Sequence, residues 1–318
     1  MELINENKEY KLSFHGTGGE YFGVVIVNWL LTAVTLGFYY PWAKANQLKY
    51  LYGASALNAD RFAFHGTGKE MFKGFIKAVL LFIVIYGVFI ALLIMKMPGI
   101  AILFFYLALL AIIPLAIHGS YRYRMSRTSW RGIRFGYRGN RKELIGNFFK
   151  WFIFTLLTLG IYGSWFSMNL RKYILDNVRL GSLEFNYKGE GGDFFLLNLK
   201  GYFLSVITLG IFMFWWQADL FAFYVDHVSV NKDGKQIRLK STATGGDFFI
   251  LLIVNMLILI CTLGLGYAWV VTRSMDFVLS KIQLEGDIDL NTINQTEENF
   301  TDATGEDVGD MLDLDFIM

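Results

Sequence analysis

One short phrase, Thr-Leu-Gly, recurs four times in this chain, each time at the end of an apolar run and just before aromatic residues. The copies begin at Thr35, Thr158, Thr208 and Thr262. A phrase that returns in this way indicates one structural unit used several times, and such a chain is interpreted unit by unit. The recurrence therefore predicts a tandem repeat, which constrains the architecture far more than the chemistry.

Each Thr-Leu-Gly run follows an alternating, aromatic segment. These segments cover 13–16, 62–66, 135–139 and 185–189, with a weaker copy at 237–240, and the second of them precedes an apolar run that lacks Thr-Leu-Gly. Such alternation predicts a short, half-buried strand. Glycine and an acidic residue then follow, as at Gly192 and Asp193, which favours a turn into the N-terminus of a helix. Each unit is therefore predicted to be a strand, a turn and a helical hairpin broken at Thr-Leu-Gly.

The composition points to a membrane. The chain is 54% hydrophobic and 17% aromatic, above the roughly 45–50% apolar content of an ordinary soluble domain. Two runs, 74–95 and 99–118, are almost free of charge and approach the roughly 20 residues that cross a bilayer core. The predicted fold class is a polytopic α-helical membrane protein of about five tandem repeats, with small cytoplasmic β elements.

Charge placement gives the predicted segments an orientation. Among the basic residues only Lys96 falls at the predicted hairpin turns, so the strands are placed in the cytoplasm and the protein in a bacterial inner membrane as a multi-pass protein. An alternative with six single spans stays open. The predicted segments are a polar N-terminus at 1–12, repeats at 13–60, 61–134, 135–184, 185–236 and 237–290, and a disordered, acidic, cytoplasmic tail at 291–318.

Ionisable residues at membrane depth are costly and usually face a cavity or a partner. Asp219 and Arg273 occupy equivalent places in the fourth and fifth units, four residues after Trp215 and Trp269. Their opposite charges predict a pair across the bundle or two walls of one cavity; structural pairing, snorkelling and interhelical hydrogen bonds are the alternatives. The candidates for a substrate path are Asp219, Arg273, Lys200, Asn28, Asn198 and Asn255.

A basic, aromatic run at 122–142 follows directly on the second long apolar run. Its juxtamembrane position favours anionic lipid headgroups over nucleic acid as the partner. His15 and His65 share the phrase Phe-His-Gly-Thr-Gly, but later units carry cations there, so no metal is expected. No catalytic or cofactor motif is recognisable, and we expect neither an enzyme nor a cofactor. The headgroup candidates are Arg122, Arg124, Arg127, Arg131 and Arg134.

The chain resembles the YjgN-like family of bacterial inner-membrane proteins, a domain of unknown function. The resemblance lies in Phe-x-Gly-x-Gly-Gly-Glu at 14–20, Thr-Leu-Gly-Phe-Tyr-Tyr-Pro-Trp-Ala at 35–43 and a second opening at 64–70, and it covers nearly all of 10–290. It implies a polytopic inner-membrane protein and supplies no substrate, catalytic residue or cofactor. A membrane metallopeptidase is the partner that it implies. The acidic tail lies outside the family pattern.

Two hypotheses for function follow. The first is permeation or transport of a small solute or ion along a path between repeats, because transporters often combine internal repeats with broken helices. The second is a non-catalytic membrane scaffold that binds a membrane protein, such as the metallopeptidase, through its strands and acidic tail. The intramembrane charges favour transport over the scaffold.

Overall fold

The chain folds as a β-barrel with a ring of α-helices at one end, which we call the crown. The computed structural model describes residues 8–286, 288–297, 302–304, 308 and 312. The strands of this described part are β1 (Lys8–Phe14), β2 (Ser55–Leu57), β3 (Asp60–Phe64), β4 (Thr128–Trp130), β5 (Ile133–Tyr137), β6 (Val178–Leu180), β7 (Leu183–Tyr187), β8 (Val228–Lys232), β9 (Lys235–Ser241) and β10 (Ile282–Gly286). Its α-helices are α1 (Gly18–Val34), α2 (Tyr40–Ala54), α3 (Gly68–Ile94), α4 (Pro98–Arg127), α5 (Arg141–Leu157), α6 (Gly163–Asp176), α7 (Gly191–Ile207), α8 (Met213–Asp226), α9 (Gly245–Cys261) and α10 (Tyr267–Ser280).

The strands close into one antiparallel barrel in the order β1-β10-β9-β8-β7-β6-β5-β4-β3-β2. β1 closes it, because Lys8–Lys11 pair with β10 and Leu12–Phe14 pair with β2. Tight turns join β2 to β3, β4 to β5, β6 to β7 and β8 to β9, and each turn contains a residue with positive φ, such as Asp233 and Gly234. Two successive residues with positive φ, as at Asp233 and Gly234, are typical of the hairpin turns whose twist best matches the twist of the flanking strands.

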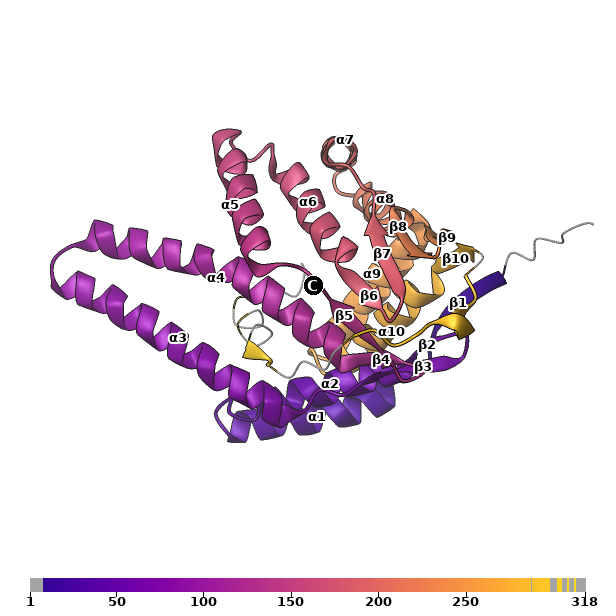
Figure 1. The fold of residues 1–318 in the computed structure, drawn as a ribbon, viewed down its shortest axis with the longest axis horizontal. Coiled ribbons are helices and arrows are strands. Elements are labelled where there is room, and N and C mark those ends of the chain that lie inside the picture. Colours follow the sequence, from indigo (N-terminus) through magenta and orange to yellow (C-terminus); the bar gives the residue numbers. More distant parts are fainter. Residues whose placement is uncertain (1–7, 287, 298–301, 305–307, 309–311, 313–318) are drawn as a thin grey trace, which may run out of the picture.

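The helices leave the barrel at the end opposite these turns (Figure 1). Each helix contacts the next one in the chain, and α10 contacts α1, so the crown is also closed. Four of the contacts use a tryptophan that lies over the first glycine of the neighbouring helix: Trp269 on Gly18, Trp42 on Gly68, Trp165 on Gly191 and Trp215 on Gly245. A close approach of this kind needs a residue without Cβ.

The Thr-Leu-Gly phrases form the tips of four hairpins. In α5–α6, the Thr158 hydroxyl donates to the carbonyl of Phe154 at 2.8 Å and accepts the backbone N–H of Tyr162 at 2.9 Å. Leu159 has φ +50° and Gly160 has φ +95°, which reverses the chain within two residues. The other three tips share these φ values and hydroxyl contacts.

The predicted fold class, a polytopic helical protein of tandem repeats with small β elements, is wrong. The strands form a complete closed barrel, and within the described residues only α3 and α4 are long and apolar enough to cross a membrane. The other helices have 14–17 residues, which is at most about 26 Å at 1.5 Å per residue and short of the hydrocarbon core. Six single spans do not form either, because each Thr-Leu-Gly run turns back on itself. The segment boundaries stay a prediction.

The interior of the barrel is apolar. Its core consists of Tyr10, Leu57, Trp130, Leu180, Leu183, Val230, Ile237, Ile288, Leu290 and Ile293. Trp130 is fully buried, and its indole N–H donates to the carbonyl of Asp60 at 3.1 Å. Ile288, Leu290 and Ile293 come from the segment after β10, and the Tyr10 hydroxyl donates to the Ile288 carbonyl. The chain downstream of the last strand therefore completes the core of the barrel.

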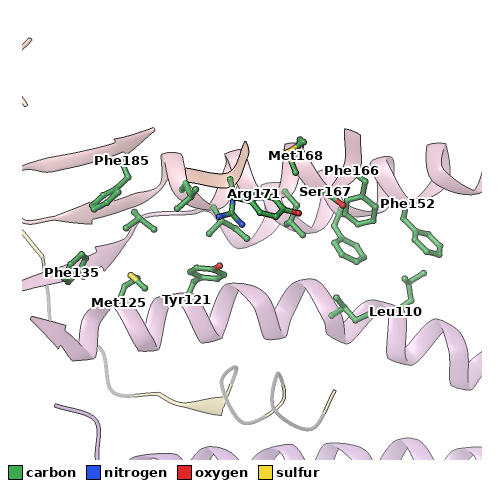
Figure 2. Close-up of a pocket in the computed structure, with 17 residues that line it drawn as sticks. Leu110, Tyr121, Met125, Phe135, Phe152, Phe166, Ser167, Met168, Arg171 and Phe185 are labelled. Atoms are coloured by element: carbon green, nitrogen blue, oxygen red, sulfur yellow. The ribbon is translucent and has the colours of Figure 1, made fainter. Parts of the chain in front are cut away.

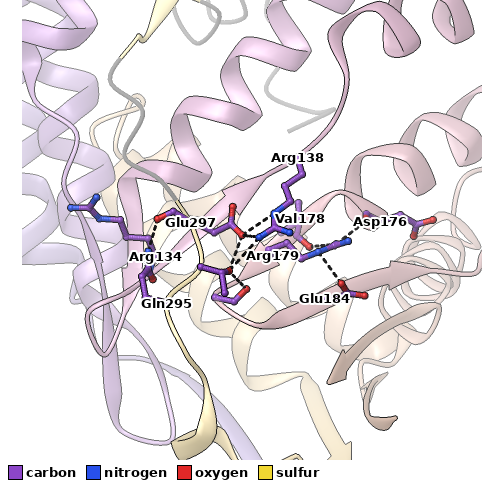
Figure 3. A network of polar contacts seen from close by, with 10 residues as sticks. Arg134, Arg138, Asp176, Val178, Arg179, Glu184, Gln295 and Glu297 are labelled. Atoms are coloured by element: carbon purple, nitrogen blue, oxygen red, sulfur yellow. Dashed lines mark hydrogen bonds and ion pairs between the residues drawn. The ribbon is translucent and has the colours of Figure 1, made fainter. Parts of the chain in front are cut away.

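The described part of the acidic segment contacts the body of the molecule, in contrast to the predicted disordered tail. The carboxylate of Glu297 lies 2.6 Å from the Arg138 guanidinium and over Gly136 of β5 (Figure 3). Further on, Asp302 pairs with Lys77 of α3 at 3.3 Å. These ion pairs and the buried Ala303 are why the segment has defined neighbours. The rest of the predicted tail lies outside the described residues.

The tryptophan contacts give a stability prediction. A Cβ at Gly245 would lie 2.5 Å from Cδ1 of Trp215, so Gly245→Ala forces α8 and α9 apart and is expected to lower the free energy of unfolding by about 1–3 kcal/mol. The matched control is Gly246→Ala, one residue on, where the nearest atom is 3.8 Å away. Thermal unfolding in detergent measures both variants. Equal midpoints for the two variants would show that the tryptophan contact does not hold the helices together.

Candidate functional site

A cleft of about 700 Å³ lies between α4, α5 and α6, and β5, β6, β7 and α8 contribute to its walls (Figure 2). Most of its lining is aliphatic or aromatic. The volume falls within the range typical of pockets for small molecules, which are mainly apolar with a few placed polar groups. The side chains used below are Leu110 and Tyr121 from α4, Phe152 from α5, Phe166 and Arg171 from α6, and Tyr224 from α8.

Among the described residues that line the cleft, Arg171 is the single charged one. Its guanidinium carbon lies 4.4 Å from the ring centroid of Tyr224 and 5.5 Å from that of Tyr187, both within the range of a cation–π contact. Its Nε is buried and has no hydrogen-bond partner among the described residues. A buried donor without a partner is costly, so this position favours a ligand that accepts a hydrogen bond.

The tyrosines around Arg171 do not neutralise it. Burial raises the pKa of Tyr187 to about 12, although the nearby Arg171 charge acts in the opposite direction. The phenol is therefore uncharged at neutral pH. The guanidinium is permanently charged, and the cleft keeps a net positive charge at this point.

The cleft is charged at one place and mainly apolar along the rest of its length. Figure 2 shows Arg171 and Tyr121 facing the same region, close to the strands that carry Phe135 and Phe185. Beyond Arg171 the picture labels Met168 and Ser167, and then Phe166, Phe152 and Leu110 toward the other end. The cleft thus offers a cationic group next to the barrel and an apolar channel that leads away from it along the helices. This arrangement matches an elongated molecule with an anionic end.

The residues predicted to form a substrate path lie elsewhere. Asp219 pairs with Lys200 at 3.8 Å, between α8 and α7. The Arg273 guanidinium instead donates to Asn255 at 3.3 Å, and the Asn255 amide donates to Ser274 at 3.1 Å, so these contacts join α9 and α10. The structure therefore distributes the two charges over separate hairpins.

The two remaining asparagines also have local partners. The Asn28 amide donates to the carbonyl of Ala43 and accepts from Asn46, both at 3.3 Å, which links α1 to α2. The Asn198 amide donates to the carbonyl of Phe194 at 2.7 Å, within α7. The lining of the cleft includes neither of these asparagines, nor Asp219, Lys200, Arg273 or Asn255.

Several of the arginines predicted to bind headgroups make contacts within the protein. Arg127 is buried and forms a bidentate pair with Glu70 of α3. Arg131 pairs with Asp60 and lies 4.5 Å from the Trp130 ring centroid. The backbone N–H of Arg134 donates to the Gln295 side chain at 2.7 Å. Arg122 and Arg124 lie in the last turns of α4, close to the barrel, and headgroup binding stays a prediction for this region.

Sequence reasoning missed Arg171, although a signal for it exists. It stands six residues after Trp165, where the other Trp-containing segments have Leu48, Phe221 and Met275. The only charged residue at an otherwise apolar position of a recurring segment is a candidate for a specific role. The predicted path rested instead on the positions four residues after the tryptophan.

Comparisons with known proteins give a family. A family model described as "Bacterial protein of unknown function (DUF898)" matches residues 9–214 and 201–311. "Inner membrane protein YjgN" of Salmonella typhimurium strain LT2 is 33% identical over 175 residues, which is 51% of this chain and 43% of that protein. The protein of the same name from Escherichia coli strain K12 is 33% identical over 164 residues, 51% of this chain and 39% of that protein. The matched region thus covers less than half the length of each of these curated relatives. No solved structure matches the chain.

Proposed function

Because this chain belongs to the bacterial DUF898 family of unknown function, whose curated relatives are named inner membrane proteins, we propose that it is an inner-membrane protein that binds one anionic amphiphile. The ligand occupies the cleft between α4, α5 and α6. Its acidic group contacts Arg171, and its hydrocarbon part extends past Phe166 toward Phe152 and Leu110. The resemblance found in the sequence, to a YjgN-like family, agrees with this membership.

The observation that carries the proposal is the buried, unpartnered Nε of Arg171 at one end of an apolar cleft. A purely apolar ligand would leave this donor unsatisfied, and a small hydrophilic anion would leave the apolar walls exposed. An amphiphile with a phosphate or carboxylate satisfies both parts, because arginine binds these groups through charge-assisted hydrogen bonds.

The membrane arrangement supports access for such a ligand. In the proposal α3 and α4 cross the inner membrane and the barrel lies in the cytoplasm. The basic residues at the end of α4 next to the barrel support this orientation, since positive charge marks the cytoplasmic side. The cleft runs along α4, so a bilayer lipid reaches it sideways without leaving the hydrocarbon region.

Passage of a small solute is the second candidate function. It is supported by the Lys200–Asp219 pair, whose half-exposed side chains place two opposite charges inside helices α7 and α8. The described barrel interior is filled by Trp130 and its apolar neighbours, so such a path would run between helices. Flux that is unchanged in Asp219→Asn proteoliposomes would contradict this candidate.

Lipid retention tests the main proposal. We expect Arg171→Gln to weaken the binding of an anionic phospholipid by about 10- to 100-fold, because a hydrogen bond to a charged group contributes about 1.5–3 kcal/mol. Native mass spectrometry of the detergent-purified protein, titrated with phosphatidylglycerol or phosphatidylethanolamine, measures the loss. Lys142→Gln is the matched control, since it removes a positive charge from an exposed site on α5 outside the cleft. Equal phosphatidylglycerol retention in both variants would contradict the proposal.

A further inference from the structure

Four exposed leucines occupy the hairpin tips. Leu36, Leu159, Leu209 and Leu263 are 90%, 95%, 94% and 93% exposed. All four are in the left-handed region, with φ of +50° or +51°, where a leucine is disfavoured by roughly 1–2 kcal/mol. In water such a residue gains no burial to offset this cost. A tip that lies in hydrocarbon gains the transfer of the whole leucine side chain.

Uncharged stretches around the tips set how deep they can lie. The hairpins with short helices are free of Asp, Glu, Lys and Arg over 21–43, 151–170, 201–218 and 248–272. Measured along α5, the distance from Lys150 to the tip is about 13 Å at 1.5 Å per residue. That matches about half of a hydrocarbon core roughly 30 Å thick. Each short hairpin therefore has enough apolar length for one leaflet.

The hairpin formed by α3 and α4 differs in length and in its tip. It extends farther from the barrel than the others (Figure 1). From Lys77 to Lys96 the α3 side covers about 28 Å, close to a full hydrocarbon core. Lys96 at its tip also has positive φ, +58°, and puts a charge where the short hairpins have leucine. A lysine in this place suits the headgroups of the opposite surface.

We propose that the four short hairpins enter only the leaflet next to the barrel and end near the bilayer midplane, while α3–α4 crosses to the other surface. The partner of the tips is the hydrocarbon of the bilayer. Of the helices in the described part of the chain, all ten then pass through the leaflet next to the barrel, and only α3 and α4 continue into the other. The inference rests on the membrane placement proposed above and does not depend on Arg171 or on any ligand of the cleft.

Depth-dependent fluorescence quenching tests this arrangement. Single cysteines replace Leu159, Leu209, Lys96 or Asp233 in a Cys261→Ser background, because Cys261 is itself exposed. Each carries a bimane label in proteoliposomes that contain lipids brominated near the headgroup or near the chain ends. We expect labels at 159 and 209 to be quenched most by chain-end bromine and not by aqueous iodide. Labels at 96 and 233 should be accessible to iodide from opposite sides.

Two outcomes would overturn the inference. Iodide quenching at 159 and 209 would place the tips in water, and quenching mainly by headgroup bromine would place them at a surface. Ile161→Cys places the label at a second exposed tip position. An unchanged unfolding midpoint shows that each labelled variant is folded. Loss of lipid binding in Arg171→Gln with unchanged depths would separate the cleft proposal from this one.

Discussion

Glu70→Ala is expected to lower the free energy of unfolding by about 3–5 kcal/mol, the range for removing one partner of a buried ion pair. Arg127 of α4 is 7% exposed and would lose its bidentate ion pair with the Glu70 carboxylate. The same carboxylate accepts the backbone N–H of Thr67 at 3.4 Å and thereby completes the capping box of α3. One substitution therefore removes both the helix cap and the link between α3 and α4. Thermal or denaturant unfolding in detergent measures the loss.

Two controls make the Glu70 result specific. Lys69→Ala changes the exposed neighbour in the same turn and should stay within about 0.5 kcal/mol of the wild type. Glu70→Gln keeps the shape and the cap but not the charge, so it should be intermediate. If Glu70→Ala unfolds like Lys69→Ala, the ion pair does not join the two long helices as described.

Trp130→Ala is expected to destabilise the barrel by about 3–5 kcal/mol, the usual loss for truncating a buried tryptophan. Its side chain is completely buried, and it packs with residues from the segment after β10. The variant therefore leaves a cavity and also loosens Ile288, Leu290 and Ile293. Unfolding experiments give the stability, and limited proteolysis downstream of β10 gives the second effect.

The matched substitutions for Trp130 separate volume from surface effects. Trp130→Phe retains most of the ring and should cost less than the alanine variant. Tyr106→Ala truncates an aromatic side chain that is 67% exposed on α4 and should leave the barrel unchanged. A Trp130→Ala variant with wild-type stability and wild-type proteolysis would contradict the filled barrel.

At each tight turn the sequence predicted the strand that follows the turn and missed the strand that precedes it. The aromatic alternation found β3, β5 and β7 within a residue or two, but β2, β4 and β6 have three residues each, too few to show a period. The available signal was in the turns. Asp233-Gly234 and Arg131-Gly132 directly precede β9 and β5, and an Asp-Gly pair between apolar runs predicts a hairpin. Closure of the barrel, through β1 and β10, joins the two ends of the chain and has no local signal.

The cleft was harder to predict than the strands. Charges at equivalent positions were expected to meet, but Asp219 and Arg273 find partners inside their own hairpins. Arg171 faces helices from two other hairpins, α4 and α8, and such contacts depend on how the crown closes. Local pattern gives a helix its apolar face, whereas the neighbours of that face come from the tertiary arrangement.

Photo-crosslinking from inside the cleft shows which lipid occupies it in a bilayer. A photoreactive phenylalanine analogue replaces Phe152 in the cleft wall or, as a control, Tyr106 on the exposed surface of α4. The protein is illuminated in bilayers of mixed phosphatidylglycerol and phosphatidylethanolamine, and the adducts are identified by mass spectrometry. We expect position 152 to capture phosphatidylglycerol above its share of the bilayer, Arg171→Gln to remove this enrichment, and position 106 to capture both lipids in bulk proportion. Capture in bulk proportion at position 152, or enrichment that survives Arg171→Gln, would contradict the binding of an anionic lipid at Arg171.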